Sequence, residues 1–213
     1  MKITVFGAAG DVGSRIVTEA LARNHQVKAV TRTSAQFDKL AAGVEACTGD
    51  ASNIDDVVRL SLGQDLVISA VRPPSGDEAT LANITQSILT GVAKTQVRLL
   101  IVGGAASLKI PGEAEMTVLT APNFLPDSVV SIAKACFAQH EVCKSDKTAN
   151  WSYLSPPAML IAGTRTGEYR LGKDELVCDA NGTSQISMED FAVVLIDEAE
   201  QPKHHRTRFT AAY

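Results

Sequence analysis

A glycine-rich turn close to the N-terminus has the composition of a phosphate-binding site. Residues 7–13 read G-A-A-G-D-V-G, follow the apolar stretch Lys2–Phe6 and precede a run of apolar residues at helical spacing. Glycine suits a tight turn that a phosphate approaches closely, and a helix beginning there presents unpaired N–H groups to that phosphate. Strand, glycine turn and helix together predict a dinucleotide-binding βαβ unit. The predicted contacts are Gly7, Ala9, Gly10, Asp11, Val12 and Gly13.

The end of the second predicted strand indicates which dinucleotide binds. A carboxylate there would hydrogen-bond a ribose 2′-hydroxyl and repel a 2′-phosphate. This chain instead has Arg32, Thr33 and Ser34. Arg32 can pair with a 2′-phosphate, and the two hydroxyls can add hydrogen bonds, so we expect NADP(H) to be preferred over NAD(H). The alternative is that Arg32 is a solvated surface arginine.

The ends of the other strands supply the remaining candidates, because the carboxyl ends of parallel strands meet at one edge of a sheet. Asp50, followed by Ala51, either contacts the adenine edge or caps the next helix. Further predicted cofactor contacts are Ala70, Val71, Arg72 and Gly103. The predicted substrate contacts are Ser107, Pro156 and Pro157.

Short apolar, β-branched runs alternate with longer amphipathic stretches, which predicts an α/β protein with a doubly wound parallel sheet, a Rossmann fold. The expected strands are Lys2–Phe6, Gln26–Thr31, Glu45–Cys47, Leu66–Ala70, Arg98–Val102 and Trp151–Ser155. The expected helices are Val12–Arg23, Asp55–Ser61, Glu78–Lys94 and Ser128–Lys147, with a short turn near 35–40.

The last third of the chain breaks this alternation. Glu168–Arg170 and Glu175–Val177 flank a glycine-containing turn and predict a hairpin, followed by a helix from about Met188 and a strand at Arg206–Thr210. We expect the elements from about residue 156 on to cover the substrate side of one domain spanning 1–213. The long connection from Gly103 to Pro126 is predicted to be a lid over a planar substrate, or else a loop packed on the core or in a dimer contact.

Charge and composition exclude several other classes of protein. The net charge of −4 gives nucleic acid no general reason to bind. The cysteines are too scattered for a disulfide framework, and neither His140 with Cys143 nor His204 with His205 has the further ligands that a metal site needs. No apolar run is long enough to span a membrane. We therefore expect a cytoplasmic monomer or homodimer that acts on a small molecule and binds no metal.

Several motifs along the chain carry a family resemblance. They include V-G-G-A at 102–105 followed by Ser107 and Leu108, S-P-P at 155–157, G-x-Y-R-x-G at 167–172 and I-S-x-E-D-F-A at 186–192. Together with the G-x-x-G-x-x-G turn they make nearly the whole chain resemble the atypical short-chain dehydrogenase/reductases. Within these it is similar to the NAD(P)H-binding group of NADH-flavin reductases, and more distantly to biliverdin reductase B and the NmrA-like proteins.

The chain departs from the larger superfamily at its catalytic pair, a Tyr-x-x-x-Lys on a helix. Tyr169 and Lys173 have this spacing, but Gly172 interrupts them and they lie in the predicted hairpin, so we interpret the match as accidental. On the expected helix His140 stands where the tyrosine would, as a candidate proton donor or positioning residue. Ser107 sits near a family serine that contacts substrate or nicotinamide. The alternatives are a helix-surface histidine and a loop cap.

Two functions fit this pattern. The resemblance implies an NADPH-dependent reductase that transfers hydride directly to free flavin (FMN or FAD) or to a similar planar acceptor such as a quinone or bilin. The loss of the tyrosine is compatible with this, because a flavin can take its proton from water. It is equally compatible with a non-catalytic NADP-binding redox sensor of the NmrA-like type. An epimerase or sugar-nucleotide dehydrogenase is disfavoured, because both need the tyrosine–lysine pair.

Overall fold

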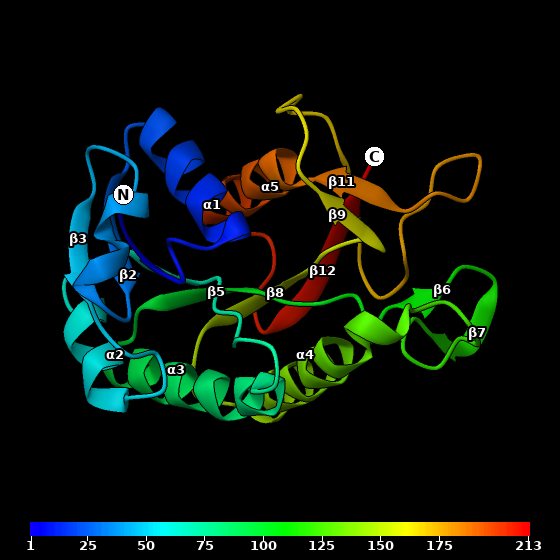
Figure 1. Cartoon of the computed structure of the whole chain (residues 1–213), viewed down its shortest axis with the longest axis horizontal. Coiled ribbons are helices and arrows are strands. Elements are labelled where there is room, and N and C mark those ends of the chain that lie inside the picture. Colours follow the sequence, from blue (N-terminus) through cyan, green and yellow to red (C-terminus); the bar gives the residue numbers. More distant parts are fainter.

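An eight-stranded sheet runs through the middle of the molecule in this computed structural model, which describes residues 1–213 apart from the side chain of Ala114 (Figure 1). In spatial order the strands are β10 (Arg170–Gly172), β12 (Thr207–Ala212), β8 (Trp151–Ser155), β5 (Arg98–Val102), β4 (Leu66–Ser69), β1 (Lys2–Phe6), β2 (Gln26–Thr31) and β3 (Glu45–Thr48). All neighbours are parallel except β10 with β12. The strand order reverses between β1 and β4, so a ligand-binding crevice is expected there.

Helices cover both faces of the sheet. α1 (Asp11–Ala22) and α5 (Met188–Glu200) pack together on one face, while α2 (Ile54–Ser61), α3 (Leu81–Thr95) and α4 (Asp127–Ser145) cover the other (Figure 1). Short 3₁₀ helices, η1 (Ser34–Lys39) and η2 (Glu78–Thr80), follow β2 and precede α3. Two small sheets lie at the end of the molecule away from β3: β9 (Met159–Ile161) with β11 (Gln185–Ser187), and β6 (Lys109–Ile110) with β7 (Glu113–Thr117).

Burial on both faces explains the continuous apolar sequences of the central strands. In β1, Ile3 and Val5 pack in the cluster beneath α1 and α5, whereas Phe6 packs in the cluster beneath α2 and α3. β4 alternates in the same way, with Ile68 on the first face and Val67 on the second. This two-sided core fixes the strands so that their carboxyl ends share one edge.

The expected doubly wound α/β fold is confirmed. β1, β2, β5 and β8 have the predicted bounds, and α1, α2 and α4 begin and end within two residues of the expected helices. The predicted helix Glu78–Lys94 instead begins with η2 before α3, because the chain enters it through a 3₁₀ turn. Within the described residues, no helix has the length and apolar character that crossing a membrane requires.

The predicted hairpin at 168–177 is wrong. β10 pairs antiparallel with β12, with Leu171 opposite Ala211, and so forms the edge of the main sheet. Glu175 forms a bridge with Lys109 instead of returning along β10. Leu171 and Gly172 of the predicted turn belong to β10, and only Lys173 and Asp174 form a bend. The open edge of the last strand offers β10 a pairing partner that no local pattern shows.

The connection from Gly103 to Pro126 is packed on the fold in this structure. It contains β6 and β7, and its Leu108 and Val118 are buried together with Leu176. Several of its residues, among them Ala105, Val118 and Leu125, also line the cavity described below. The segment therefore both packs against the body of the protein and forms part of a cavity wall.

A buried ion pair ties α5 to the amino end of β5, at the edge opposite the crevice. The carboxylate of Glu198 accepts a hydrogen bond from Arg98, and the two side chains are 4% and 11% exposed. Glu198 also accepts from His204 Nδ1 at 2.8 Å and from the backbone N–H groups of Lys203 and His204. Burial raises the pKa of Glu198, but these hydrogen bonds outweigh it and hold the pKa below its usual value.

Replacing Arg98 should destabilise the fold strongly. Arg98→Met leaves the buried Glu198 carboxylate without its cation, and losing one partner of a buried pair costs about 3–5 kcal/mol. The matched control is Lys144→Met, which removes one partner of the exposed pair with Glu141 and should cost only about 0–1 kcal/mol. Urea unfolding at neutral pH measures both values. Equal losses in the two variants would show that Glu198 does not depend on Arg98.

Candidate functional site

A large cavity opens at the carboxyl ends of β1, β2, β4, β5 and β8. Its volume is about 1250 Å³, which exceeds the range of about 300–1000 Å³ usual for a single drug-sized ligand. It extends from Arg32 after β2, past the glycine turn after β1, to Pro156 after β8. The sequence-predicted residues that line it are Gly7, Ala9, Gly10, Asp11, Val12, Arg32, Asp50, Ala51, Ala70, Val71, Arg72, Gly103, Pro156 and Pro157. The crevice at the switch point therefore has room for a dinucleotide and a second ring system.

Close backbone packing explains the first and third glycines of the turn. Gly7 has a φ of +78°, and a Cβ there would lie 2.4 Å from the carbonyl oxygen of Ala70. A Cβ on Gly13 would lie 2.0 Å from the carbonyl oxygen of Gly7. Gly13 does not line the cavity. It packs against the turn itself and so lets α1 approach β1 closely.

The first turn of α1 is free to receive an anion. Its N-cap residue is Gly10, and no side chain caps the helix. The Gly10 N–H donates to the Gly7 carbonyl, but Asp11 and Val12 at the start of the helix also line the cavity, so their unpaired N–H groups lie at its wall. These residues fit the diphosphate of a dinucleotide, because a helix N-terminus attracts negative charge and supplies N–H donors.

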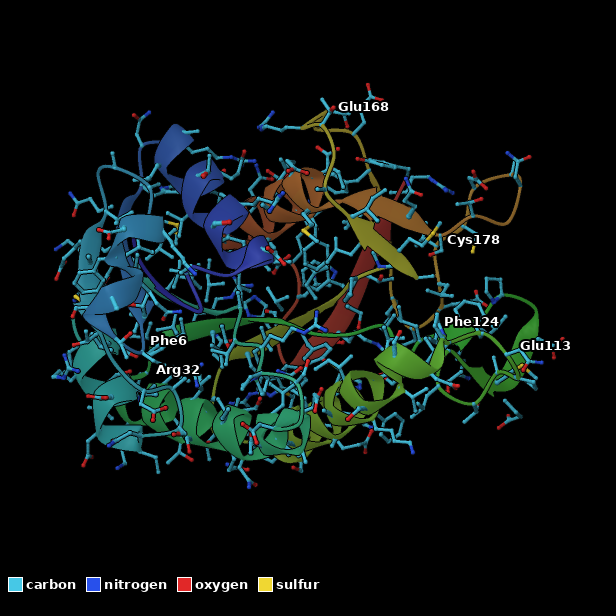
Figure 2. All side chains as sticks on the ribbon, viewed as in Figure 1. Phe6, Arg32, Glu113, Phe124, Glu168 and Cys178 are labelled. Atoms are coloured by element: carbon cyan, nitrogen blue, oxygen red, sulfur yellow. The ribbon has the colours of Figure 1, made fainter. Side chains whose placement is uncertain are left out.

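Arg32, which is labelled in Figure 2, lies exposed at the cavity after β2 and, among the described residues, has no hydrogen-bond or ion-pair partner. Thr33 and Ser34 are exposed at the start of η1 but do not line the cavity. Gln36, which sequence reasoning missed, does line it. An unpartnered guanidinium at this strand end fits a 2′-phosphate.

Asp50 lies in the cavity wall, and its side chain organises the turn after β3. Its carboxylate accepts hydrogen bonds from the backbone N–H of Ser52 at 2.8 Å and from the Ser52 hydroxyl at 2.7 Å. The cap of α2 is Asn53, whose side chain accepts from the N–H groups of Asp55 and Asp56. Of the two alternatives for Asp50, the helix cap is therefore wrong, and contact with the adenine remains a prediction.

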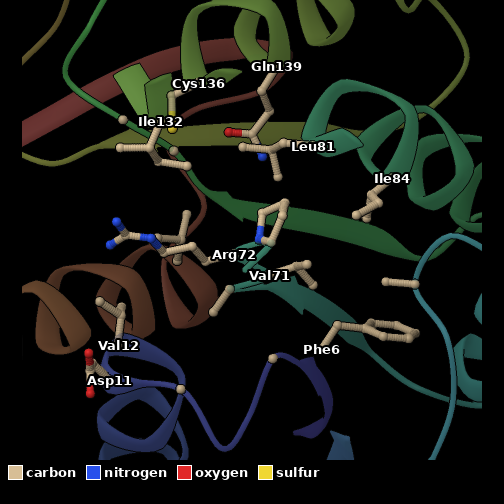
Figure 3. Close-up of a pocket in the computed structure, with 18 of the residues that line it drawn as sticks. Phe6, Asp11, Val12, Val71, Arg72, Leu81, Ile84, Ile132, Cys136 and Gln139 are labelled. Carbon is tan, nitrogen blue, oxygen red and sulfur yellow. The ribbon is translucent and has the colours of Figure 1, made fainter. Parts of the chain in front are cut away.

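The other half of the cavity is predominantly apolar, and α4 forms much of its wall. Figure 3 shows Ile132 and Cys136 of α4 across the cavity from Asp11 and Val12 of α1. The α4 residues that line it are Val129, Ile132, Ala133, Cys136 and Gln139, and Val118, Leu125, Leu160 and Met188 come from other elements. Sequence reasoning missed this wall. The three- and four-residue spacing within α4 is the signal that could have placed these residues on one helix face.

The buried Tyr153 stabilises this wall through hydrogen bonds on the side away from the cavity. Tyr153 of β8 donates to the side-chain carbonyl of Gln139 or the main-chain carbonyl of Cys136, at 3.0 and 3.1 Å, and accepts from the Gly104 N–H at 3.1 Å. Its ring occupies the space that a Cβ on Gly103 would need. Burial raises the pKa of Tyr153 well above its usual value, so the phenol stays protonated and fixes the wall in place.

Cys136 is a neutral thiol at the cavity surface. Burial raises its pKa to about 11, although the positive charge of Arg72 opposes this increase. Its sulfur packs against Gly104, and a Cβ on Gly104 would lie only 2.8 Å from the Cys136 Sγ. The side chain therefore contributes shape rather than charge to the cavity.

Ser107 and His140 meet each other but do not line the cavity. The Ser107 hydroxyl lies 3.3 Å from His140 Nδ1 and accepts a hydrogen bond of 2.6 Å from Arg208. Arg208 in turn donates to the Asp174 carboxylate. Burial lowers the pKa of His140 to about 4, and the charge of Arg208 adds to this effect. His140 is thus neutral at physiological pH and can accept the Ser107 proton.

Tyr169 and Lys173 do not form a catalytic pair at the cavity, and neither lines it. The Tyr169 hydroxyl donates to Asp197 of α5, on the opposite side of the sheet from α4. The interpretation of their spacing as accidental agrees with this position.

Comparisons with known proteins agree with this geometry. A structure from Bacteroides thetaiotaomicron, provisionally named an epimerase, is 39% identical, covers 100% of this chain and 96% of its own, and has a TM-score of 0.89. A Streptococcus pneumoniae structure, provisionally named an NADH-flavin reductase, is 31% identical, with coverage of 100% and 99% and a TM-score of 0.89. The uncharacterized protein YwnB of Bacillus subtilis is 29% identical over 212 residues, 99% of this chain and 97% of YwnB.

The family model described as NAD(P)H-binding matches residues 7–202, from the first glycine of the turn to beyond the end of α5. This span contains every element that lines the cavity except the N-terminal strand that leads into it. The chain belongs to the NAD(P)H-binding family.

Proposed function

We propose that the protein is an NADPH-dependent reductase of free flavin or a similar planar acceptor, such as a quinone or bilin. The observation that carries the proposal is one continuous cavity, which is polar where a dinucleotide would bind and predominantly apolar beyond it. In this proposal the whole chain, 1–213, acts as one unit, and its elements from about residue 156 on contribute to the acceptor side.

The polar half is suited to NADP(H). Arg32 would pair with the 2′-phosphate, and the free first turn of α1 would hold the diphosphate. Ala70 and Val71 after β4 and Gly103 after β5 lie along the path from there toward the apolar half. When bound, the reduced nicotinamide would supply hydride from its C4 position.

The apolar half is suited to positioning a ring system rather than to donating a proton. No tyrosine, lysine or histidine is among the described residues that line the cavity. An acceptor that takes its proton from water needs only to be stacked and oriented, which Ile132, Leu125 and Pro156 can do. A carbonyl substrate would need a proton donor at this place, so flavins and quinones fit better.

Ser107 and His140 have a supporting place in this proposal. The Ser107 hydroxyl donates to neutral His140 and accepts a hydrogen bond from Arg208. These two contacts hold Ser107 beside the turn from Gly103 to Ala106. Ser107 would then fix the loop that borders the nicotinamide, and His140 would fix Ser107. The neutral imidazole also argues against His140 as an imidazolium acid at physiological pH.

The relative from Bacteroides is provisionally named an epimerase, which is a different class of enzyme. Epimerases that oxidise and reduce a sugar need a general acid and base beside the nicotinamide. The absence of tyrosine, lysine and histidine from the described lining disfavours that chemistry here.

The first test is anaerobic oxidation of NADPH with FMN, FAD, riboflavin or a simple quinone, alongside calorimetric NADPH binding. We expect NADPH oxidation that depends on the acceptor, because the cavity places two rings together. Nicotinamide absorbance measures the rate. Tight NADPH binding without turnover on any of these acceptors would contradict the proposal and favour a redox sensor.

A second test addresses cofactor preference. Arg32→Ala should weaken NADPH binding by about tenfold, the lower end expected for a charge-assisted hydrogen bond because Arg32 is exposed, and leave NADH binding unchanged. Calorimetry of both cofactors measures this. The matched control is Lys39→Ala, which removes an exposed cation of η1 that does not line the cavity. Equal losses of NADPH and NADH affinity in Arg32→Ala would overturn the assignment.

A further inference from the structure

Arg72 is the second guanidinium in the cavity without a partner. It lies three residues after the end of β4 and is exposed, and among the described residues it makes no hydrogen bond or ion pair. Pro73 and Pro74 come next, and Pro73 is buried, so the backbone beside Arg72 has little freedom. Figure 3 shows its side chain extending between Val12 of α1 and Ile132 of α4. The Arg72 guanidinium is therefore available to bind an anion inside the cavity.

The anionic groups of NADPH have other partners in the proposed arrangement. The 2′-phosphate lies at Arg32 and the diphosphate at the first turn of α1, both on the side of the cavity formed by β1 and β2. The charge of Arg72 instead acts on Cys136, which belongs to α4 and packs against the turn after β5. In a doubly wound sheet the two mononucleotide halves lie on opposite sides of the switch point, so this is the nicotinamide side.

Resting on the proposed function, we propose that Arg72 binds a phosphate group of the acceptor, so that a phosphorylated flavin is the preferred substrate class. The isoalloxazine would lie on the apolar wall that contains Ile132, and the ribityl chain would carry the phosphate to the guanidinium. Arginine suits this role because its planar fork donates two parallel hydrogen bonds to a phosphate. The interaction concerns binding alone, and no bond is made or broken by Arg72.

FMN and riboflavin provide the matched pair of probes, because they share one ring system and differ in the phosphate. We would titrate each into the NADP⁺-saturated protein by calorimetry, for the wild type and for Arg72→Gln and Arg72→Lys. The wild type should prefer FMN by about tenfold, as a charge-assisted contact predicts. Arg72→Gln should lose this preference while its riboflavin affinity is unchanged, and Arg72→Lys should keep part of it. The control Lys134→Gln removes an exposed cation of α4 that does not line the cavity and should keep the full preference.

Two results would overturn this assignment. One is that the wild type binds FMN and riboflavin with equal affinity, or binds neither of them. The other is a loss of NADPH affinity in Arg72→Gln with the FMN preference intact, which would place Arg72 at the diphosphate. NADPH oxidation measured in parallel separates this proposal from the reductase activity. A preference for FMN that depends on Arg72, without any turnover, would support the phosphate site and reject the reductase.

Discussion

The cavity depends on the close packing of backbones around one glycine turn. The turn after β1 passes so near the end of β4 that only glycine fits at position 7, and α1 begins so near that turn that only glycine fits at position 13. These contacts bring the N-terminus of α1 to the edge where the strands end. The free N–H groups of the helix, Arg32 and Arg72 consequently face one crevice. A side chain at either glycine would push the helix away and separate the groups that make the site.

The apolar half depends on a different constraint, the packing of α4 against the sheet. Tyr153 is fully buried beneath it and connects Gly104, Cys136 and Gln139, all of which line the cavity. Gln139 also donates to Thr85, which extends the network to α3. This buried polar network, with its donors and acceptors paired, gives the apolar half of the cavity a fixed shape.

Much of the fold could be predicted from the sequence because its elements have strong local signals. The bounds of β1 and β2 follow from short apolar runs that glycine or polar residues terminate, and the glycine turn lies where the strand-to-helix pattern places it. The pairing of β10 with β12 could not be predicted, because it joins segments about forty residues apart with no local signature. Similarly, Cys136 and Gln139 reach the cavity only through the way α4 lies on the sheet. The half near the glycine turn could therefore be largely predicted from the sequence. In the apolar half Pro156 and Pro157 could be predicted, whereas the wall formed by α4 could not.

The most direct measurement of the central claim is an anaerobic single turnover of the NADPH-loaded protein with FMN, comparing NADPH with NADPH deuterated on either face of C4. Direct hydride transfer across the cavity predicts that flavin bleaching slows for deuterium on one face only, because the wall fixes one ring orientation. Flavin that stays oxidised while NADPH is bound, or bleaching that is insensitive to deuterium on both faces when chemistry limits the rate, would contradict it.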